Sequence, residues 1–306
     1  MKTVAVVGGA GFIGSHIADR FLLDENCRVV VIDNLSSGEK ANVNPRATFV
    51  PLDIVRAEIG AIARALKGCS EIWHFAANVS IPRGEIDRFV DLRENVEGTV
   101  RLLEAAVSAG SKKFILASSS AVYGLGSAKR PRETAPCEPI SMYGASKLAA
   151  EGYLSAYCDN FGISGTTFRI ANVVGARLSC GLLYDILKKR GAGKVFLKGL
   201  GLEKKSYVHV SDCVEGMLRG AQAFVPGKNE IFNLGSDDKV SVKKVSEIVS
   251  RLAGITETGF LGGKTWVGDV PEMVLNCKKL KSLGWAPKLI KSSAALEAAT
   301  RELLAE

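Results

Sequence analysis

The sequence predicts an α/β protein, built on a doubly wound parallel sheet with a smaller α/β domain on its C-terminal side. Over the first 175 residues, short apolar runs of strand length alternate with helix-length amphipathic segments. This alternation is typical of a parallel sheet wrapped by helices. The length of 306 residues, with 47% apolar residues, suits one large or two smaller domains with a well-buried core.

Six apolar runs are the predicted strands, in order along the chain. They cover 3–8, 27–33, 47–53, 71–77, 113–120 and 165–175. Each has the length of a buried strand. A long helical pattern runs from about 91 to 109 between the fourth and fifth strands, and a second helix fills most of 141–162.

After Gly175 the pattern becomes irregular. It contains helices near 181–190 and 241–253, strands near 195–197, 205–210 and 230–236, and two terminal helices. These segments are too short and broken for a second wound sheet. We therefore expect a first domain over 1–175, to which 205–233 returns, and a smaller domain from 176–204 and 234–306.

The net charge of +8, from 40 Lys and Arg against 32 Asp and Glu, permits an anionic partner without naming one. The basic doublets are dispersed along the chain without interleaved aromatic residues. A nucleic-acid site usually gathers its positive charge on one face of the protein. We therefore interpret the charge as a solvated surface and expect no nucleic-acid partner.

Cysteines and histidines predict neither a disulfide framework nor a metal site. The seven cysteines are dispersed without a CxxC pair, and the three histidines are not at metal-ligand spacing. No apolar run is long enough to span a bilayer, and the first residues enter a strand without a leader. We expect reduced thiols, no metal, no membrane association and a cytoplasmic location.

A glycine-rich turn, VVGGAGFIG, joins the first strand to the first helix and predicts a dinucleotide site of the Rossmann type. Gly8, Gly11 and Gly14 would let the backbone approach a pyrophosphate at the helix N-terminus. Asp33 ends the second strand 19 residues after Gly14, where a carboxylate binds ribose hydroxyls and repels a 2′-phosphate. These positions favour NAD over NADP, although such a turn alone could merely connect strand and helix.

Tyr143 and Lys147 lie one helical turn apart in SMYGASK, so both side chains share a helix face. They could form an acid–base pair in which the ammonium lowers the phenol pKa. They could equally form a surface turn in which the ring packs on an aliphatic stem. The heptapeptide alone does not separate these interpretations.

The glycine turn, Asp33, the serine run ASSSAVYG and the YxxxK motif together resemble the extended short-chain dehydrogenase/reductase family. Further matching segments are YVHVSD (207–212), NLGS (233–236), GDVP (268–271) and LGWAP (283–287). Within the family the chain is most similar to the nucleotide-sugar 4-epimerases, for which DNLSSG after the second strand is typical. The resemblance covers nearly the whole chain and implies a Rossmann-type NAD-binding domain with a smaller C-terminal substrate-binding domain.

This resemblance implies three catalytic residues and an activity. Tyr143 would be the base, Lys147 would bind the nicotinamide ribose and lower the Tyr143 pKa, and Ser119 would hydrogen-bond the reacting hydroxyl. Ser119 is chosen because it lies four residues before Tyr123 of the VYG motif. The implied activity is the NAD-dependent interconversion of UDP-glucose and UDP-galactose, by C4 oxidation, rotation of the 4-keto sugar and re-reduction.

The resemblance also implies the remaining contacts. Those for NAD are Gly8, Gly11, Phe12, Ile13, Gly14, Asp33, Asn34, Ser37, Gly38, Asp53, Ile54, Ala76, Ala77, Asn95, Ser118, Tyr143 and Lys147. Those for the UDP-sugar are Ser119, Tyr143, Asn172, Lys205, Trp266 and Asp269. Family members commonly dimerise through the helix at 91–109 and the helix carrying Tyr143, which implies a homodimer.

Departures from the family pattern bear on the reaction and the substrate. Related dehydratases and decarboxylases carry acids where this chain has Ser120 and Ala121, so simple 4-epimerisation is favoured. Two arginines that usually clamp the diphosphate are Trp266 and Lys205 here, and lysine lacks bidentate geometry. In related epimerases, side-chain size at the position of Met273 helps decide whether N-acetyl sugars fit. Another UDP-sugar, such as an N-acetylhexosamine or a uronic acid, and a non-catalytic NAD-binding regulator stay open as alternatives.

Overall fold

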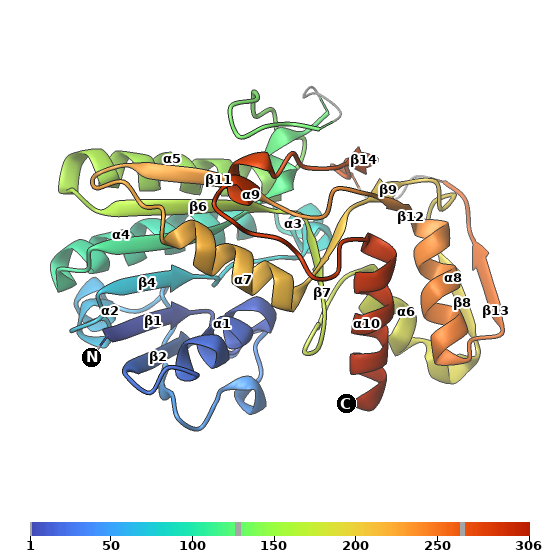
Figure 1. Ribbon diagram of the computed structural model, residues 1–306, viewed down its shortest axis with the longest axis horizontal. Coiled ribbons are helices and arrows are strands. Elements are labelled where there is room, and N and C mark those ends of the chain that lie inside the picture. Colours follow the sequence, from blue (N-terminus) through green and yellow to red (C-terminus); the bar gives the residue numbers. More distant parts are fainter. Residues whose placement is uncertain (1, 126–129, 264–266) are drawn as a thin grey trace.

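The computed structural model describes residues 2–125, 130–263 and 267–306. Its main sheet has seven strands (Figure 1), and every neighbouring pair is parallel. In spatial order they are β11 (Asn229–Leu234), β6 (Ser164–Ile170), β5 (Lys113–Ser119), β4 (Glu71–His74), β1 (Lys2–Val7), β2 (Cys27–Asp33) and β3 (Thr48–Pro51). The predicted doubly wound parallel sheet is confirmed.

The strand order reverses between β1 and β4, which are neighbours in the sheet although two strands separate them in sequence. Ligands of such sheets bind beyond the carboxyl ends of the strands at this switch point. The glycine turn after β1 and the segment after β4 meet there, because the Ala76 N–H donates to the Val7 carbonyl at 3.0 Å.

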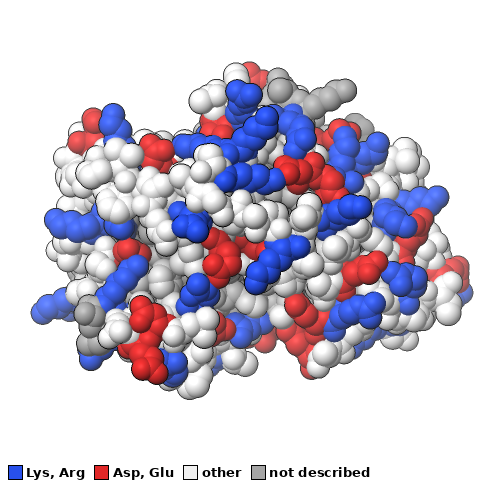
Figure 2. Space-filling view, viewed as in Figure 1, with Lys and Arg blue, Asp and Glu red and all other residues white. Residues whose placement is uncertain are grey.

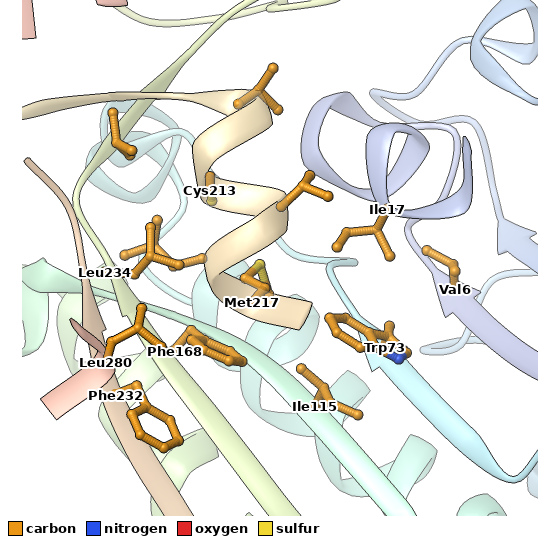
Figure 3. Packing of buried hydrophobic residues seen from close by; sticks show 14 of the residues in the cluster. Val6, Ile17, Trp73, Ile115, Phe168, Cys213, Met217, Phe232, Leu234 and Leu280 are labelled. Atoms are coloured by element: carbon orange, nitrogen blue, oxygen red, sulfur yellow. The ribbon is translucent and has the colours of Figure 1, made fainter. Parts of the chain in front are cut away.

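Helices cover both faces of the sheet. One face carries α1 (Phe12–Leu22) and α7 (Val210–Ala221), and the other carries α2 (Ile59–Ala65), α4 (Gly98–Ala109) and α5 (Met142–Phe161). Figure 3 shows Met217 of α7 packed toward Phe168 and Ile115 of the sheet. Removing these large apolar side chains from water is the main source of stability for the layered arrangement.

The smaller domain has its own apolar core, between helices and two parallel strands. Its elements are α6 (Leu182–Lys188), α8 (Val242–Ala253), α10 (Ser292–Ala305), β8 (Lys194–Leu197) and β13 (Glu257–Phe260). They lie together on one side of the main sheet in Figure 1.

Short strands occupy the region between the two cores. β7 (Asn172–Val174) pairs with β10 (Tyr207–His209), and β9 (Lys204–Lys205) lies between β12 (Val240–Ser241) and β14 (Glu272–Met273). The remaining short elements are α3 (Ile81–Ile86), the π-helix Leu92–Glu97, α9 (Lys278–Ser282) and 3₁₀ turns at Lys40–Asn42, Ser120–Tyr123 and Arg190–Ala192. The limits of the two domains stay a prediction.

Two expected strands are each divided in the structure. The run at 165–175 becomes β6 in the main sheet and β7 paired with β10, with Ala171 between them. The run at 205–210 becomes β9 and β10, which belong to different small sheets. Neither break carries a glycine or a proline, so the sequence offered no turn signal that could locate them. The helix expected from 91 begins as the π-helix before α4.

Lys and Arg are interspersed with Asp and Glu over the face in Figure 2, and pairs such as Lys279–Glu230, at 2.9 Å, bring opposite charges together. The seven cysteines are all free thiols. In the described part of the chain, no helix is long and apolar enough to cross a membrane, and no potential metal-ligand cluster occurs.

Candidate active site

The glycine turn at the end of β1 is too tightly packed for larger residues. Gly8 has a φ of 81°, and a Cβ there would lie 2.4 Å from the Ala76 amide nitrogen. A Cβ on Gly14 would lie 2.3 Å from the Gly8 carbonyl oxygen. The turn therefore needs glycine for backbone freedom at Gly8 and for close packing of α1 at Gly14.

The N-terminus of α1 is open to an anion. Within α1, which is fully described, no side chain caps the N-terminus and no acidic residue occupies the first turn. The first N–H groups of a helix lack intrahelical partners and carry a partial positive charge. A pyrophosphate is the kind of group that such a turn and helix end bind, so the residues present fit a dinucleotide.

Asp33 is fixed beside the glycine turn. Its carboxylate accepts hydrogen bonds from the Ala10 N–H at 2.9 Å and from the Leu35 N–H at 2.8 Å. The side chain is buried, and its negative charge at the end of β2 opposes a 2′-phosphate. Gly38 closes over the same turn, because a Cβ there would lie 2.8 Å from the Ala10 carbonyl carbon.

Three of the expected NAD contacts, Asn34, Asp53 and Ile54, lie just after β2 and β3. Asn34 donates to the Asp53 carboxylate at 3.0 Å. Although burial works against it, the hydrogen bonds from Asn34 and from the Val55 and Arg56 N–H groups lower the pKa of Asp53. Ile54 is buried in the core. Of the other cofactor candidates, Ser37 is exposed and Gly11, Phe12, Ile13, Ala76 and Ala77 are half-buried.

Ser119, Tyr143 and Lys147 meet at the carboxyl end of β5. Ser119 is the last residue of β5 and hydrogen-bonds the Tyr143 phenol. Lys147 Nζ lies 5.9 Å from the centre of the Tyr143 ring and donates to the Ala117 carbonyl at 3.0 Å. Ser141 caps α5 by accepting from the Gly144 N–H at 3.0 Å, which fixes where the helix and its tyrosine begin.

Burial shifts the pKa values of Tyr143 and Lys147 in opposite directions. It raises the pKa of Tyr143 to about 12, and the hydrogen bond with Ser119 opposes part of that rise. It lowers the pKa of Lys147 to about 8, against the attraction of Asp91 and Glu151. At neutral pH the structure thus holds a phenol beside an ammonium. A further positive charge near Tyr143, such as an oxidised nicotinamide ring, would favour the phenolate.

Ser118 has a different environment from Ser119. Its hydroxyl donates to Glu151 of α5, and Glu151 pairs with Arg169 of β6 at 2.7 Å, both side chains being buried. Arg169 also donates to the Tyr123 hydroxyl at 3.0 Å. This network ties the end of β5 to two neighbouring elements. Sequence reasoning missed it because its members are single residues in separate elements.

Asn95 lies in the π-helix and joins three segments around the site. Its side-chain oxygen accepts from the Asn78 N–H at 2.7 Å, and its amide donates to Ser146 at 2.9 Å. It thereby connects the segment after β4 to α5, next to Lys147. π-Helical turns of this kind are frequent at functional sites, yet no sequence signal here predicts one.

The substrate-side candidates come from the short strands. Asn172 is exposed at the start of β7 and donates to the Ser206 carbonyl at 3.1 Å. The Lys205 ammonium donates to Asp269 at 2.6 Å and to the Val270 carbonyl. Lys205 and Asp269 are thus bound to each other. Trp266 lies outside the described residues.

Comparisons with known proteins identify the family and the structural relatives of this chain. A model of the NAD dependent epimerase/dehydratase family matches residues 4–235. The chain is 33% identical over 304 residues to the UDP-glucose 4-epimerase of Mycolicibacterium smegmatis, covering 94% of each. A crystal structure of UDP-galactose 4-epimerase has a TM-score of 0.88 at 36% identity, over 100% of this chain and 99% of that one. A UDP-N-acetylglucosamine 4-epimerase of Methanobrevibacter ruminantium has a TM-score of 0.87 at 25% identity, over 99% and 98%.

Proposed function

The chain belongs to the NAD dependent epimerase/dehydratase family, and on that premise we propose that it interconverts UDP-glucose and UDP-galactose. Its relatives and structural neighbours make it an NAD-dependent nucleotide-sugar epimerase acting at C4 of a UDP-sugar. The choice of hexose is our proposal. It is supported by the similarity to UDP-glucose and UDP-galactose 4-epimerases.

One observation carries the catalytic assignment: Ser119, Tyr143 and Lys147 lie together at the carboxyl end of β5, beside the switch point of the sheet. Ser120 and Ala121, which follow Ser119, offer no carboxyl group for a dehydration or decarboxylation. A non-catalytic NAD-binding regulator would have no need of the three side chains in this arrangement.

In the proposed reaction, Tyr143 takes the proton of the sugar 4-hydroxyl and Ser119 holds that hydroxyl by a hydrogen bond. Lys147 stabilises the phenolate by charge and binds the nicotinamide ribose. Bound NAD would supply the hydride acceptor and donor at C4. The glycine turn and Asp33 would hold the cofactor. After the 4-keto sugar rotates, C4 would be reduced on its opposite face while Tyr143 returns the proton to O4.

The diphosphate of the substrate would bind near Asn172 and Lys205. Lys205 must then exchange its Asp269 partner for phosphate oxygens, or share the ammonium between them, since one ammonium has three donors. Trp266 is proposed as a further contact on sequence grounds. An N-acetylhexosamine is the second candidate sugar, favoured by the similarity to a UDP-N-acetylglucosamine 4-epimerase and by the flexible, half-buried Met273.

A substrate panel tests the proposal. Purified protein is incubated separately with UDP-galactose, UDP-N-acetylgalactosamine and UDP-galacturonate, and each 4-epimer is quantified. We expect the highest kcat/KM with UDP-galactose. A preference of tenfold or more for either other sugar would overturn the hexose assignment while leaving the reaction class intact.

We also propose a homodimer through the segment at 91–109 and α5. Leu92 and Tyr153 are 54% and 46% exposed and provide apolar surface on these two segments. Leu103 and Leu154, on the same two helices, are fully buried in the chain's own core. A second copy would therefore contact the outer surface of the helices.

A further inference from the structure

A buried carboxylate lies close to the proposed catalytic pair and has no role in the reaction outlined above. Asp91, just before the π-helix, is 1% exposed. Its Oδ1 accepts from Asn78 Nδ2 at 2.9 Å and from Asn95 Nδ2 at 3.1 Å. Its Oδ2 is buried and has no hydrogen-bond partner among the described residues. A carboxylate in this state is costly unless nearby positive charge compensates it.

Gly84 of α3 packs against the unpartnered oxygen of Asp91. A Cβ on Gly84 would lie 2.6 Å from Oδ2, so glycine at this position leaves room for the carboxylate. Arg83, the neighbouring cation on α3, already pairs with the half-buried Glu94 at 2.9 Å. The carboxylate is therefore held in place without an ion-pair partner from α3.

The compensating charge comes from α5. Asp91 acts electrostatically on the Lys147 ammonium and on the Tyr143 phenol. The other titratable groups facing this pair are Glu151 on α5, His74 on β4 and Cys180 after β7. Burial lowers the pKa of His74 to about 3, so this imidazole is neutral and adds no positive charge.

We propose that Asp91 is a positioning residue for the Tyr143–Lys147 pair: it holds Asn78 and Asn95 beside α5 and balances the buried Lys147 ammonium. The inference rests on the proposed function, which makes Tyr143 the base. Asp91 fixes the position of the pair through Asn95, which donates to Ser146, the residue next to Lys147, at 2.9 Å. The negative charge of Asp91 acts directly on Tyr143 and Lys147 of α5.

Removing the Asp91 charge should shift the pKa values of Lys147 and Tyr143 in the same direction. Asp91 raises the pKa of Lys147 and also raises the pKa of Tyr143. The active form needs a deprotonated Tyr143 and a protonated Lys147. The two limbs of the rate profile follow the titrations of these two groups. Loss of the Asp91 charge therefore shifts both limbs to lower pH.

Asp91→Asn tests this, because the amide oxygen can still accept from Asn78 and Asn95 while the charge is lost. We expect both limbs of kcat/KM against pH to move down by about 0.5–1 pH unit. Asp87→Asn is the matched control. Asp87 lies four residues earlier, is exposed and pairs with Arg93, so its profile should coincide with that of the unmodified enzyme.

A spectroscopic readout separates this inference from the proposed function. The tyrosinate absorbance of Tyr143 is titrated as the difference between each enzyme and its Tyr143→Phe counterpart. Asp91→Asn should lower the midpoint even if no epimerisation is found. A lower kcat with unmoved limbs and an unmoved tyrosinate midpoint would overturn the inference. If Asp91→Asn does not fold, Asp91→Ser removes the same charge and leaves room for water.

Discussion

The buried Lys147 ammonium affects the free energy of unfolding as well as the proposed chemistry. Burial lowers its pKa to about 8, so below that pH the folded protein holds an ammonium that water would solvate better. The unfolded chain binds the extra proton between about pH 8 and the ordinary lysine value near ~10.4. Stability contributed by this group therefore rises with pH across that window. The folded protein thus keeps a charge that opposes folding at the position proposed for the catalytic lysine.

Lys147→Met is accordingly expected to be inactive but more stable than the unmodified, cofactor-free protein at neutral pH. We expect a gain of about 1–3 kcal/mol in the free energy of unfolding, because the burial penalty of the ammonium outweighs its attraction to Asp91 and Glu151, and methionine fills similar volume without a charge. Urea unfolding at several pH values measures it. The gain should shrink between about pH 8 and pH 10. A Lys147→Met variant that is less stable than the unmodified protein at every pH would contradict the inference that the buried ammonium opposes folding.

Single residues also show what the sequence could and could not predict. The spacing to Tyr123 selected Ser119, and the structure gives Ser119 the hydrogen bond to Tyr143 while Ser118 donates to Glu151. The partners of Lys147 were invisible in the sequence. Asp91 and Glu151 belong to no motif, and their effect depends on burial and on contacts between elements distant in the chain.

The glycines of α1 and α5 allow a prediction at the scale of an element. Gly14→Ala should lower stability by about 1–3 kcal/mol and weaken NAD binding, because its Cβ would lie 2.3 Å from the Gly8 carbonyl and push α1 from the turn. Gly152→Ala in α5 is the matched control. It is exposed with no atom within 4 Å of the new Cβ, so it should raise stability by about 0.5–1 kcal/mol. Thermal unfolding and NAD titration of both variants provide the measurement.

The buried Glu151–Arg169 pair joins α5 to β6 and should be sensitive to loss of one partner. Glu151→Leu leaves the Arg169 guanidinium buried without its carboxylate, which should lower the free energy of unfolding by about 3–5 kcal/mol. Adding Arg169→Met should recover much of that loss. A double variant as unstable as the single one would show that hydrogen bonds to other groups, and not the charge pair, dominate.

Elements with one consistent period were predictable, and those interrupted by tertiary pairing were not. β2 was predicted with the bounds Cys27–Asp33 that the structure gives it. The division of 165–175 into β6 and β7 follows from their different partners, β11 and β10. The π-helix before α4 likewise depends on the buried contacts of Asp91 and Asn95, which periodicity does not record.

For the whole molecule, the proposed dimer gives a separate prediction. Leu92→Glu with Tyr153→Glu would place two charges on the proposed interface and should convert a dimer to a monomer in light scattering. Leu261→Glu is the control, because Leu261 is also exposed, at 69%, but lies after β13 in the smaller domain. An unmodified chain that is monomeric at micromolar concentration would contradict the dimer.

We propose that this chain inverts C4 of a UDP-sugar without net oxidation, so that NAD stays bound and is regenerated in each turnover. The most direct test incubates the purified protein with UDP-galactose carrying deuterium at C4, without added NAD. We predict UDP-glucose that retains the deuterium at C4, with no conversion by Tyr143→Phe. Product that has exchanged its label with solvent, or conversion that survives Tyr143→Phe, would contradict the account.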